Sequence, residues 1–114
     1  MQSTRQNKIC RLIQQDMGDI FLREMKPVLG QSMITVTHVR ITPDLSIARI
    51  HVSIMPLGGA TVEGVMALIR ENTSDLRRRL GMREGKQLRI IPQLEFFLDD
   101  SLDYIENIER LLKQ

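Results

Sequence analysis

Residues 72–101 read NTSDLRRRLGMREGKQLRIIPQLEFFLDDS. The first half has apolar residues at helical spacing around three consecutive arginines, Arg77, Arg78 and Arg79. The second half, residues 88–98, predicts a strand with one buried face, formed by Leu88, Ile90, Leu94, Phe96 and Leu98. A basic helix that leads directly into a buried strand indicates a surface for a polyanion rather than a pocket for bond-making chemistry.

A helical pattern begins before this segment and covers residues 61–81. Thr61 is a suitable N-cap and Gly81 a suitable C-cap. The apolar stripe is interrupted only at Asn72, Thr73 and Ser74, whose side chains compete for backbone hydrogen bonds. Two interpretations stay open, one weakened helix or two short helices that meet at a kink, and we favour the kink.

The N-terminal region predicts another helix, over residues 4–26. Its apolar residues recur at helical spacing and form one face. Pro27 pushes the residue before it out of the helical region, so the helix is expected to end at Lys26.

Two strands are expected next, over residues 33–41 and 47–55, joined by a turn at Pro43 and Asp44. The second strand alternates cleanly between apolar and polar residues. In the first strand the apolar residues change face near Thr37 and His38, which predicts a β-bulge at that point.

The order of elements is therefore α-β-β-α-α-β, followed by a short C-terminal helix over residues 102–112. Pro92 cannot donate a backbone hydrogen bond, so the third strand is expected at a sheet edge or with a bulge. A chain of 114 residues has the length of one domain. We expect a single domain over residues 1–114, an α+β fold with a three-stranded sheet and its helices on one face.

The charge of the chain is unevenly distributed, although its formal net value is only +2. Residues 95–114 contain six acidic and two basic residues, which leaves fourteen basic and eight acidic residues, a balance of +6, in residues 1–94. This segregation predicts a basic working surface. The sequence shows no leader and no apolar run of membrane-spanning length, so we expect a soluble, cytoplasmic protein with no membrane contact.

The sequence offers no convincing site for metal binding or catalysis. His38 and His51 lie on neighbouring predicted strands, but the third candidate ligand, Cys10, lies on a helix. No serine or cysteine has a base at motif spacing. Asp99 and Asp100 precede a helical pattern and are suited to capping it. We therefore expect no metal, no cofactor and no enzymatic activity.

Basic residues gather between residues 70 and 89, where three acidic residues oppose them. Arginine suits phosphate because its planar guanidinium donates two parallel hydrogen bonds. Neighbouring helical residues are about 100° apart, so Arg78 should be the most exposed arginine, while Arg77 and Arg79 flank the apolar stripe. The alternative is an ordinary solvated face. The candidate phosphate-binding residues are Arg70, Arg77, Arg78, Arg79, Arg83, Lys86 and Arg89.

Three segments resemble one protein family. Residues 44–53, DLSIARIHVS, resemble the DLxxAxVYVS strand of ribosome-binding factor A, a bacterial small-subunit assembly factor. Residues 76–81, LRRRLG, and residues 88–102, LRIIPQLEFFLDDSL, are similar to a helix and to the RxxPxLxFxxDxS strand of that family. The resemblance runs in order over nearly the whole chain. It implies a type II KH-like domain, whose α-β-β-α-α-β order agrees with the pattern above.

KH domains that bind single strands carry a GxxG loop between their two central helices. This chain contains no GxxG. The family it resembles has a helical kink at that place, commonly Ala-x-Gly, and here Asn72, Thr73 and Ser74 occupy the position.

The resemblance implies a protein that binds the immature 30S subunit and its 16S rRNA precursor and assists late rRNA processing without being a nuclease. Other assembly factors are further expected partners, and we expect a monomer. The basic helix and its kink would hold phosphates, with little reading of base sequence. Arg77, Arg78, Arg79 and Arg83 rank first as contacts, Lys86 and Arg89 next, and Arg5, Lys8 and Arg11 form an extension on the N-terminal helix.

An alternative function in the same fold is a protein-interaction module that docks on a ribosomal protein or another assembly factor. The docking surface would be the open face of the sheet, where Ile91 and Phe97 are expected to point outward.

Overall fold

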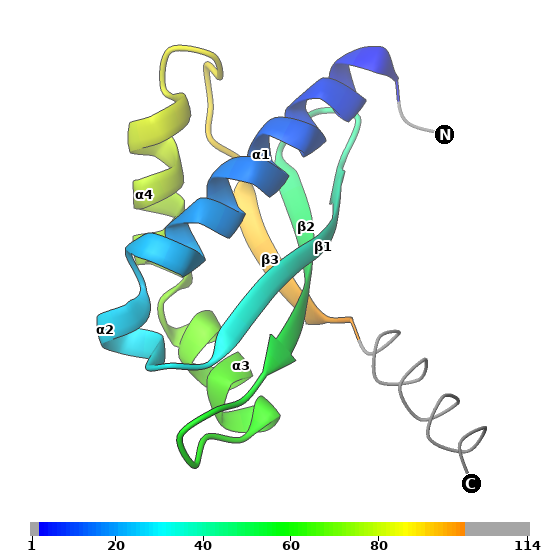
Figure 1. The fold of residues 1–114 in the computed structure, drawn as a ribbon. Coiled ribbons are helices and arrows are strands. Elements are labelled where there is room, and N and C mark those ends of the chain that lie inside the picture. Colours follow the sequence, from blue (N-terminus) through cyan, green and yellow to red (C-terminus); the bar gives the residue numbers. More distant parts are fainter. Residues whose placement is uncertain (1–2, 100–114) are drawn as a thin grey trace, which may run out of the picture.

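A computed structural model of the chain describes residues 3–99. Helices α1, α3 and α4 cover one face of a three-stranded sheet (Figure 1), which confirms the α+β prediction. The predicted C-terminal helix lies outside the described residues. The elements are α1 (Thr4–Arg23), α2 (Lys26–Leu29), β1 (Met33–Ile41), β2 (Ile47–Met55), α3 (Val62–Glu71), α4 (Thr73–Glu84) and β3 (Gln93–Leu98).

The strand order is β1-β2-β3, with β1 antiparallel and β3 parallel to β2. The register of β1 against β2 shifts between Val36 and His38, which confirms the predicted bulge. The extra residue lets Val36 and Val39 both face the core, although they are three positions apart. The Thr37 hydroxyl at the bulge is 2.6 Å from Oδ2 of Asp99.

Helix α1 begins with a reciprocal cap between Ser3 and Gln6. It ends at Arg23, so the predicted end at Lys26 is wrong. Pro27 lies instead in the first turn of α2, where its missing N–H is not needed by the helix. Met25, which lies between the two helices, is fully buried.

Helices α3 and α4 are separate, as the kink interpretation expected. Thr61 caps α3 by accepting a hydrogen bond from the Gly64 N–H at 3.0 Å. Asn72 lies between the helices, and its side-chain amide donates to the Leu68 carbonyl at 2.8 Å. The Thr73 hydroxyl donates to the Arg70 carbonyl at 2.8 Å. These bonds are the local competition with helical pairing that the sequence indicated.

Helix α4 continues to Glu84, so the predicted C-cap at Gly81 is wrong. Gly81 is a helical residue at a close contact instead. A Cβ atom at this position would lie 3.2 Å from Cγ1 of Ile91, on the segment that leads into β3. The glycine therefore allows α4 to approach that segment.

Strand β3 begins at Gln93, so the predicted start at residue 88 is wrong. Leu94 and Phe96 are buried as expected, but Ile90 is 75% exposed. Pro92 has no N–H for a sheet ladder, and the Ile91 and Pro92 carbonyls accept hydrogen bonds from an arginine side chain, described below. Ordinary strand pairing is therefore confined to the residues after Pro92.

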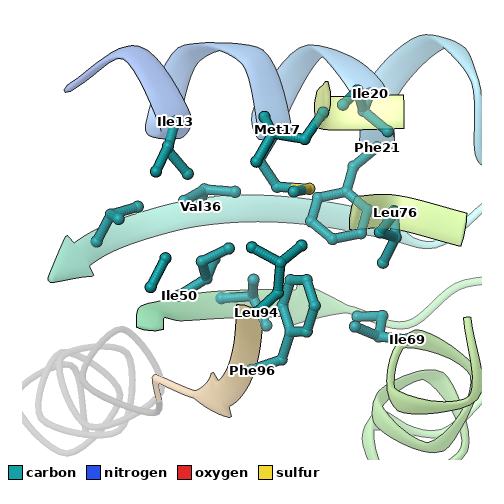
Figure 2. Packing of buried hydrophobic residues seen from close by; sticks show 14 of the residues in the cluster. Ile13, Met17, Ile20, Phe21, Val36, Ile50, Ile69, Leu76, Leu94 and Phe96 are labelled. Carbon is teal, nitrogen blue, oxygen red and sulfur yellow. The ribbon is translucent and has the colours of Figure 1, made fainter. Parts of the chain in front are cut away.

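The core lies between α1 and the sheet (Figure 2). Ile13 and Met17 of α1 point toward β1 and β2, and both are fully buried. The rings of Phe21 and Phe96 meet edge to face, with centroids 6.1 Å apart. Burial of these side chains holds α1 across the strands. The position of α1 in turn determines where its exposed side chains lie.

Candidate functional site

Two arginines of α4 form an ionic network with the end of α1. Arg79 lies 2.9 Å from both Glu24 and Asp75, and Arg83 lies 2.6 Å from Glu24 and 2.7 Å from Asp19. The side chains of Arg79 and Arg83 are only 28% and 29% exposed. These contacts tie α4 to the end of α1, because Asp19 and Glu24 are both held by cations of α4.

The same contacts shift the pKa values of the acids. Hydrogen bonds from Arg83 and then Arg79 hold the pKa of Glu24 below its usual value. The pKa of Asp19 is lowered mainly by Arg83, and that of Asp75 by Arg79 and then Arg78. All three carboxylates are therefore ionised at neutral pH, and they neutralise the arginines beside them.

The other two arginines of the cluster also have partners within the protein. Arg77 donates to the Pro92 carbonyl at 3.0 Å and to the Ile91 carbonyl at 2.7 Å, and so connects α4 to the segment before β3. Arg78 is 60% exposed, as its helical position predicted, but it pairs with Asp75 at 2.6 Å.

The four arginines ranked first from the sequence are thus brought together on α4, yet all four bond to protein groups. In the described structure, the guanidinium groups of these four arginines are therefore engaged by carboxylates, backbone carbonyls or the Met82 sulfur. Arg77, Arg79 and Arg83 support the fold, and contact of any of the four with RNA stays a prediction. Arg70, at the end of α3, lies 3.4 Å from the Phe96 carbonyl.

A second group of basic side chains has no such partners. Arg5, Lys8 and Arg11 lie on the first half of α1, and Lys86 and Arg89 lie on the connection from α4 to β3. All five residues are exposed, and none forms an ion pair or side-chain hydrogen bond with another residue of the described range 3–99. These five residues, ranked lower from the sequence, are therefore available to an anionic ligand in the part of the chain that the structure describes.

These cations border a cleft at one end of the molecule. The first half of α1, the turn from β1 to β2 and the connection from α4 to β3 meet there (Figure 1). The cleft has a volume of about 410 Å³. Its lining residues are Arg5, Lys8, Ile9, Ile41, Asp44, Leu45, Ser46, Gln87, Leu88, Arg89, Ile90 and Pro92.

Glu84 lies on the inner side of α4, where it is completely buried. No described residue gives its carboxyl oxygens a hydrogen bond of good geometry. Desolvation, followed by the nearby Asp16 carboxyl, raises the pKa of Glu84 to about 8. Glu84 is therefore mostly neutral at pH 7. A count of acidic residues in the sequence treats Glu84 as a negative charge, but in the folded protein it does not offset the basic charge.

The sheet face opposite the described helices carries a row of three rings. His51 lies between His38 and Phe97, with centroid separations of 5.7 Å and 5.4 Å. Phe97 is 39% exposed, as expected, whereas Ile91 is partly buried against the core and does not point fully outward. Within residues 3–99, no three His, Cys, Asp or Glu side chains are grouped closely enough to hold a metal ion.

No helix in the described part of the chain is long and apolar enough to span a membrane.

Comparison with known proteins gives a consistent result. A family model described as Ribosome-binding factor A matches residues 5–112. The ribosome-binding factor A of Cytophaga hutchinsonii is 41% identical over 114 residues, which is 100% of this chain and 84% of that protein. The protein of the same name from Flavobacterium johnsoniae is 43% identical over 115 residues, covering 98% of this chain and 85% of the relative.

Solved structures show the same fold. The crystal structure of ribosome-binding factor A from Thermus thermophilus superposes with a TM-score of 0.65 at 20% identity, covering 82% of this chain and 94% of that one. A homology model of the Thermus thermophilus factor, fitted into a cryo-EM map of its complex with the 30S subunit, gives a TM-score of 0.62 at 21% identity, covering 80% and 91%. The KH-like fold is confirmed. This chain belongs to the ribosome-binding factor A family.

Proposed function

We propose that this protein binds the immature 30S subunit in the cytoplasm, through its 16S rRNA precursor, and assists late rRNA processing without catalysing it. The family is named for ribosome binding, and a Thermus thermophilus member has been fitted into a map of a 30S complex. The single observation that carries the proposal is an exposed basic surface whose members have no ion-pair partner within residues 3–99, namely Arg5, Lys8, Arg11, Lys86 and Arg89.

Unpaired cations favour RNA because each phosphate contact releases condensed counterions. Paired cations contribute less, since a phosphate must first displace a carboxylate. Within residues 3–99, Arg78, Arg79 and Arg83 of α4 are paired with carboxylates. Five cations without such partners in that range lie at the end of the molecule where α1 begins. The RNA-facing surface is therefore centred on α1 and the connection from α4 to β3.

The test is complementation of a strain depleted of this protein. Depletion should cause unprocessed 16S precursor and immature small subunits to accumulate, and the wild-type chain should reverse both. A variant with Arg5, Lys8 and Arg89 changed to alanine should not restore processing. Arg23→Ala should restore it fully, because Arg23 is a 73% exposed arginine at the opposite end of α1 and already pairs with Asp19 at 2.6 Å. Normal processing in the depleted strain would refute the proposed function.

A second candidate function is docking on a ribosomal protein or another assembly factor through the open face of the sheet. The observation that favours it is the stacking of the exposed Phe97 ring on His51. Here Phe97→Ala should abolish association with precursor subunits, and added salt should have little effect. Loss of binding in the triple cation variant, with Phe97→Ala unchanged, would exclude this candidate.

A further inference from the structure

The cleft between α1 and the connection from α4 to β3 has an apolar floor and a cationic rim. Leu88 and Ile90 supply apolar lining from the connection to β3, and Ile9 supplies it from α1. Ile90 is 75% exposed. A volume of about 410 Å³ lies within the range of about 300–1,000 Å³ that small ligands occupy. The cleft is thus large enough for a planar group the size of a nucleobase.

The rim has three cations without protein partners in the described range. Arg5 and Lys8 lie one turn apart on α1, and Arg89 lines the cleft from the connection to β3. Three like charges around one opening repel each other in the absence of a ligand, and an anion between them removes that repulsion. The cleft therefore favours a ligand that combines negative charge with an apolar body.

The third wall is a turn with a fixed conformation. Leu45 has φ of 63°, in the left-handed region that is unusual for a residue with a side chain. Asp44 Oδ1 holds the turn by accepting from the Thr42 hydroxyl at 2.7 Å and the Ser46 hydroxyl at 2.8 Å. The carboxylate of Asp44, the acidic residue in the lining of the cleft, is therefore engaged in hydrogen bonds within the turn. The turn places the apolar Leu45 in the lining.

A second depression continues from the cleft along α1. The cleft and this second depression share four lining residues, Lys8, Ile9, Gln87 and Leu88. Arg11 lines the second depression. Together the two depressions form a continuous path along which a single-stranded RNA could lie, and cations border this path. An RNA duplex would offer phosphates to these cations but would leave the apolar floor empty, because its bases are stacked inside the helix.

We propose that this cleft binds one unstacked nucleotide of a single-stranded RNA segment. The base lies against the apolar side chains of Leu88 and Ile90, and the flanking phosphates contact Arg5, Lys8 and Arg89. Among the described residues, those that line the cleft include no aromatic ring. The site consequently accepts any base with a modest preference, unlike platforms built from exposed aromatic rings. The inference rests on the proposed RNA-binding function and places the contact away from the kink at Asn72.

The test measures binding of the full-length chain to oligouridylate, oligoadenylate and a short RNA duplex by fluorescence anisotropy. Ile90→Ser removes an apolar floor group without changing charge, and it should weaken single-strand binding about fivefold, the equivalent of about 1 kcal/mol. Duplex binding and the salt dependence should not change. The matched control is Met82→Ser, because Met82 is 76% exposed on α4 and is not a lining residue of the cleft.

Arg89→Ala should weaken binding to both RNA forms and reduce the salt slope by about one. The control is Arg23→Ala, which removes one arginine that lies away from the cleft and is paired with Asp19. Circular dichroism with urea unfolding verifies that each variant is folded, which the exposure of Ile90 and Arg89 favours. Methyl NMR of the full-length chain gives an independent measurement, because the Ile90 and Leu88 signals should shift with the single strands and not with the duplex.

The outcomes separate this inference from the proposed function. If Ile90→Ser binds single strands as tightly as Met82→Ser does, and the Ile90 methyl signal does not move, the nucleotide site is refuted. If wild-type protein still binds precursor subunits in that case, the proposed function is retained, and the RNA contacts a different surface of the protein. Absence of binding by wild-type protein to precursor subunits and to every RNA probe would refute both.

Discussion

Replacement of Glu84 by glutamine should remove a large pH dependence of stability. Glu84 is completely buried, and its pKa is raised to about 8 in the folded protein from a usual value of 4.5. The folded state then holds a proton that the unfolded state releases between these two values. Stability from this group is fully present below the unfolded pKa and is lost as pH rises toward the folded pKa.

The size of the effect follows from the pKa difference. Each pH unit between the two pKa values lowers the free energy of unfolding by about 1.4 kcal/mol. From about pH 5 to about pH 7.5, wild-type protein should therefore lose about 3 kcal/mol relative to Glu84→Gln. The buried amide adds a roughly constant cost of about 1–3 kcal/mol for unmade hydrogen bonds, so only the difference in slope is diagnostic.

Urea unfolding of both proteins at several pH values gives these slopes directly. Contributions from groups that the two proteins share cancel in the comparison. Parallel curves from about pH 5 to about pH 7.5 would refute the reasoning. They would mean that Glu84 is ionised in the folded protein with a normal pKa.

Two further outcomes follow from the fold. Phe96→Ala should reduce the free energy of unfolding by about 3–5 kcal/mol in urea titrations, because a ring that is 4% exposed leaves a cavity, and a loss below about 1 kcal/mol would contradict the packing. Glu24→Gln should lower the urea midpoint at neutral pH, because Arg79 and Arg83 lose a charged partner. Below the pKa of Glu24 the same substitution should lower the midpoint much less, because the wild-type carboxyl is then protonated. An equal decrease at both pH values would mean that these ion pairs do not contribute to stability.

The sheet was largely predictable from the sequence. The clean alternation of residues 47–55 indicated β2, and the change of phase near Thr37 located the bulge in β1. Both signals are local, because side chains alternate along a strand whatever packs against it. The break at Asn72 was also predictable, since its side chain bonds to the backbone of the preceding turn.

Element ends that depend on tertiary contacts were not predictable. Gly81 looked like a helix terminus, but it serves a close contact with Ile91. The segment before Gln93 has a strand-like pattern, but its carbonyls accept hydrogen bonds from the Arg77 side chain. Both contacts join α4 to the segment that leads into β3, so a pattern read along one element could not reveal them.

The state of the arginines was only half predictable. Asp75 lies three residues before Arg78 and four before Arg79, so those two pairs follow from helical spacing. Glu24 and Asp19 pair with arginines 55 to 64 residues away, and only the packing of α4 on α1 brings them together. The sequence thus identified the basic residues but ranked the paired ones above those at the cleft.

The most direct measurement is the salt dependence of binding to purified precursor 30S subunits, compared between wild-type protein, the variant with Arg5, Lys8 and Arg89 changed to alanine, and Arg23→Ala. Wild-type protein and Arg23→Ala should share a steep slope, and the triple variant should bind more weakly with a slope lower by about three. A slope and affinity unchanged in the triple variant would show that Arg5, Lys8 and Arg89 do not face RNA.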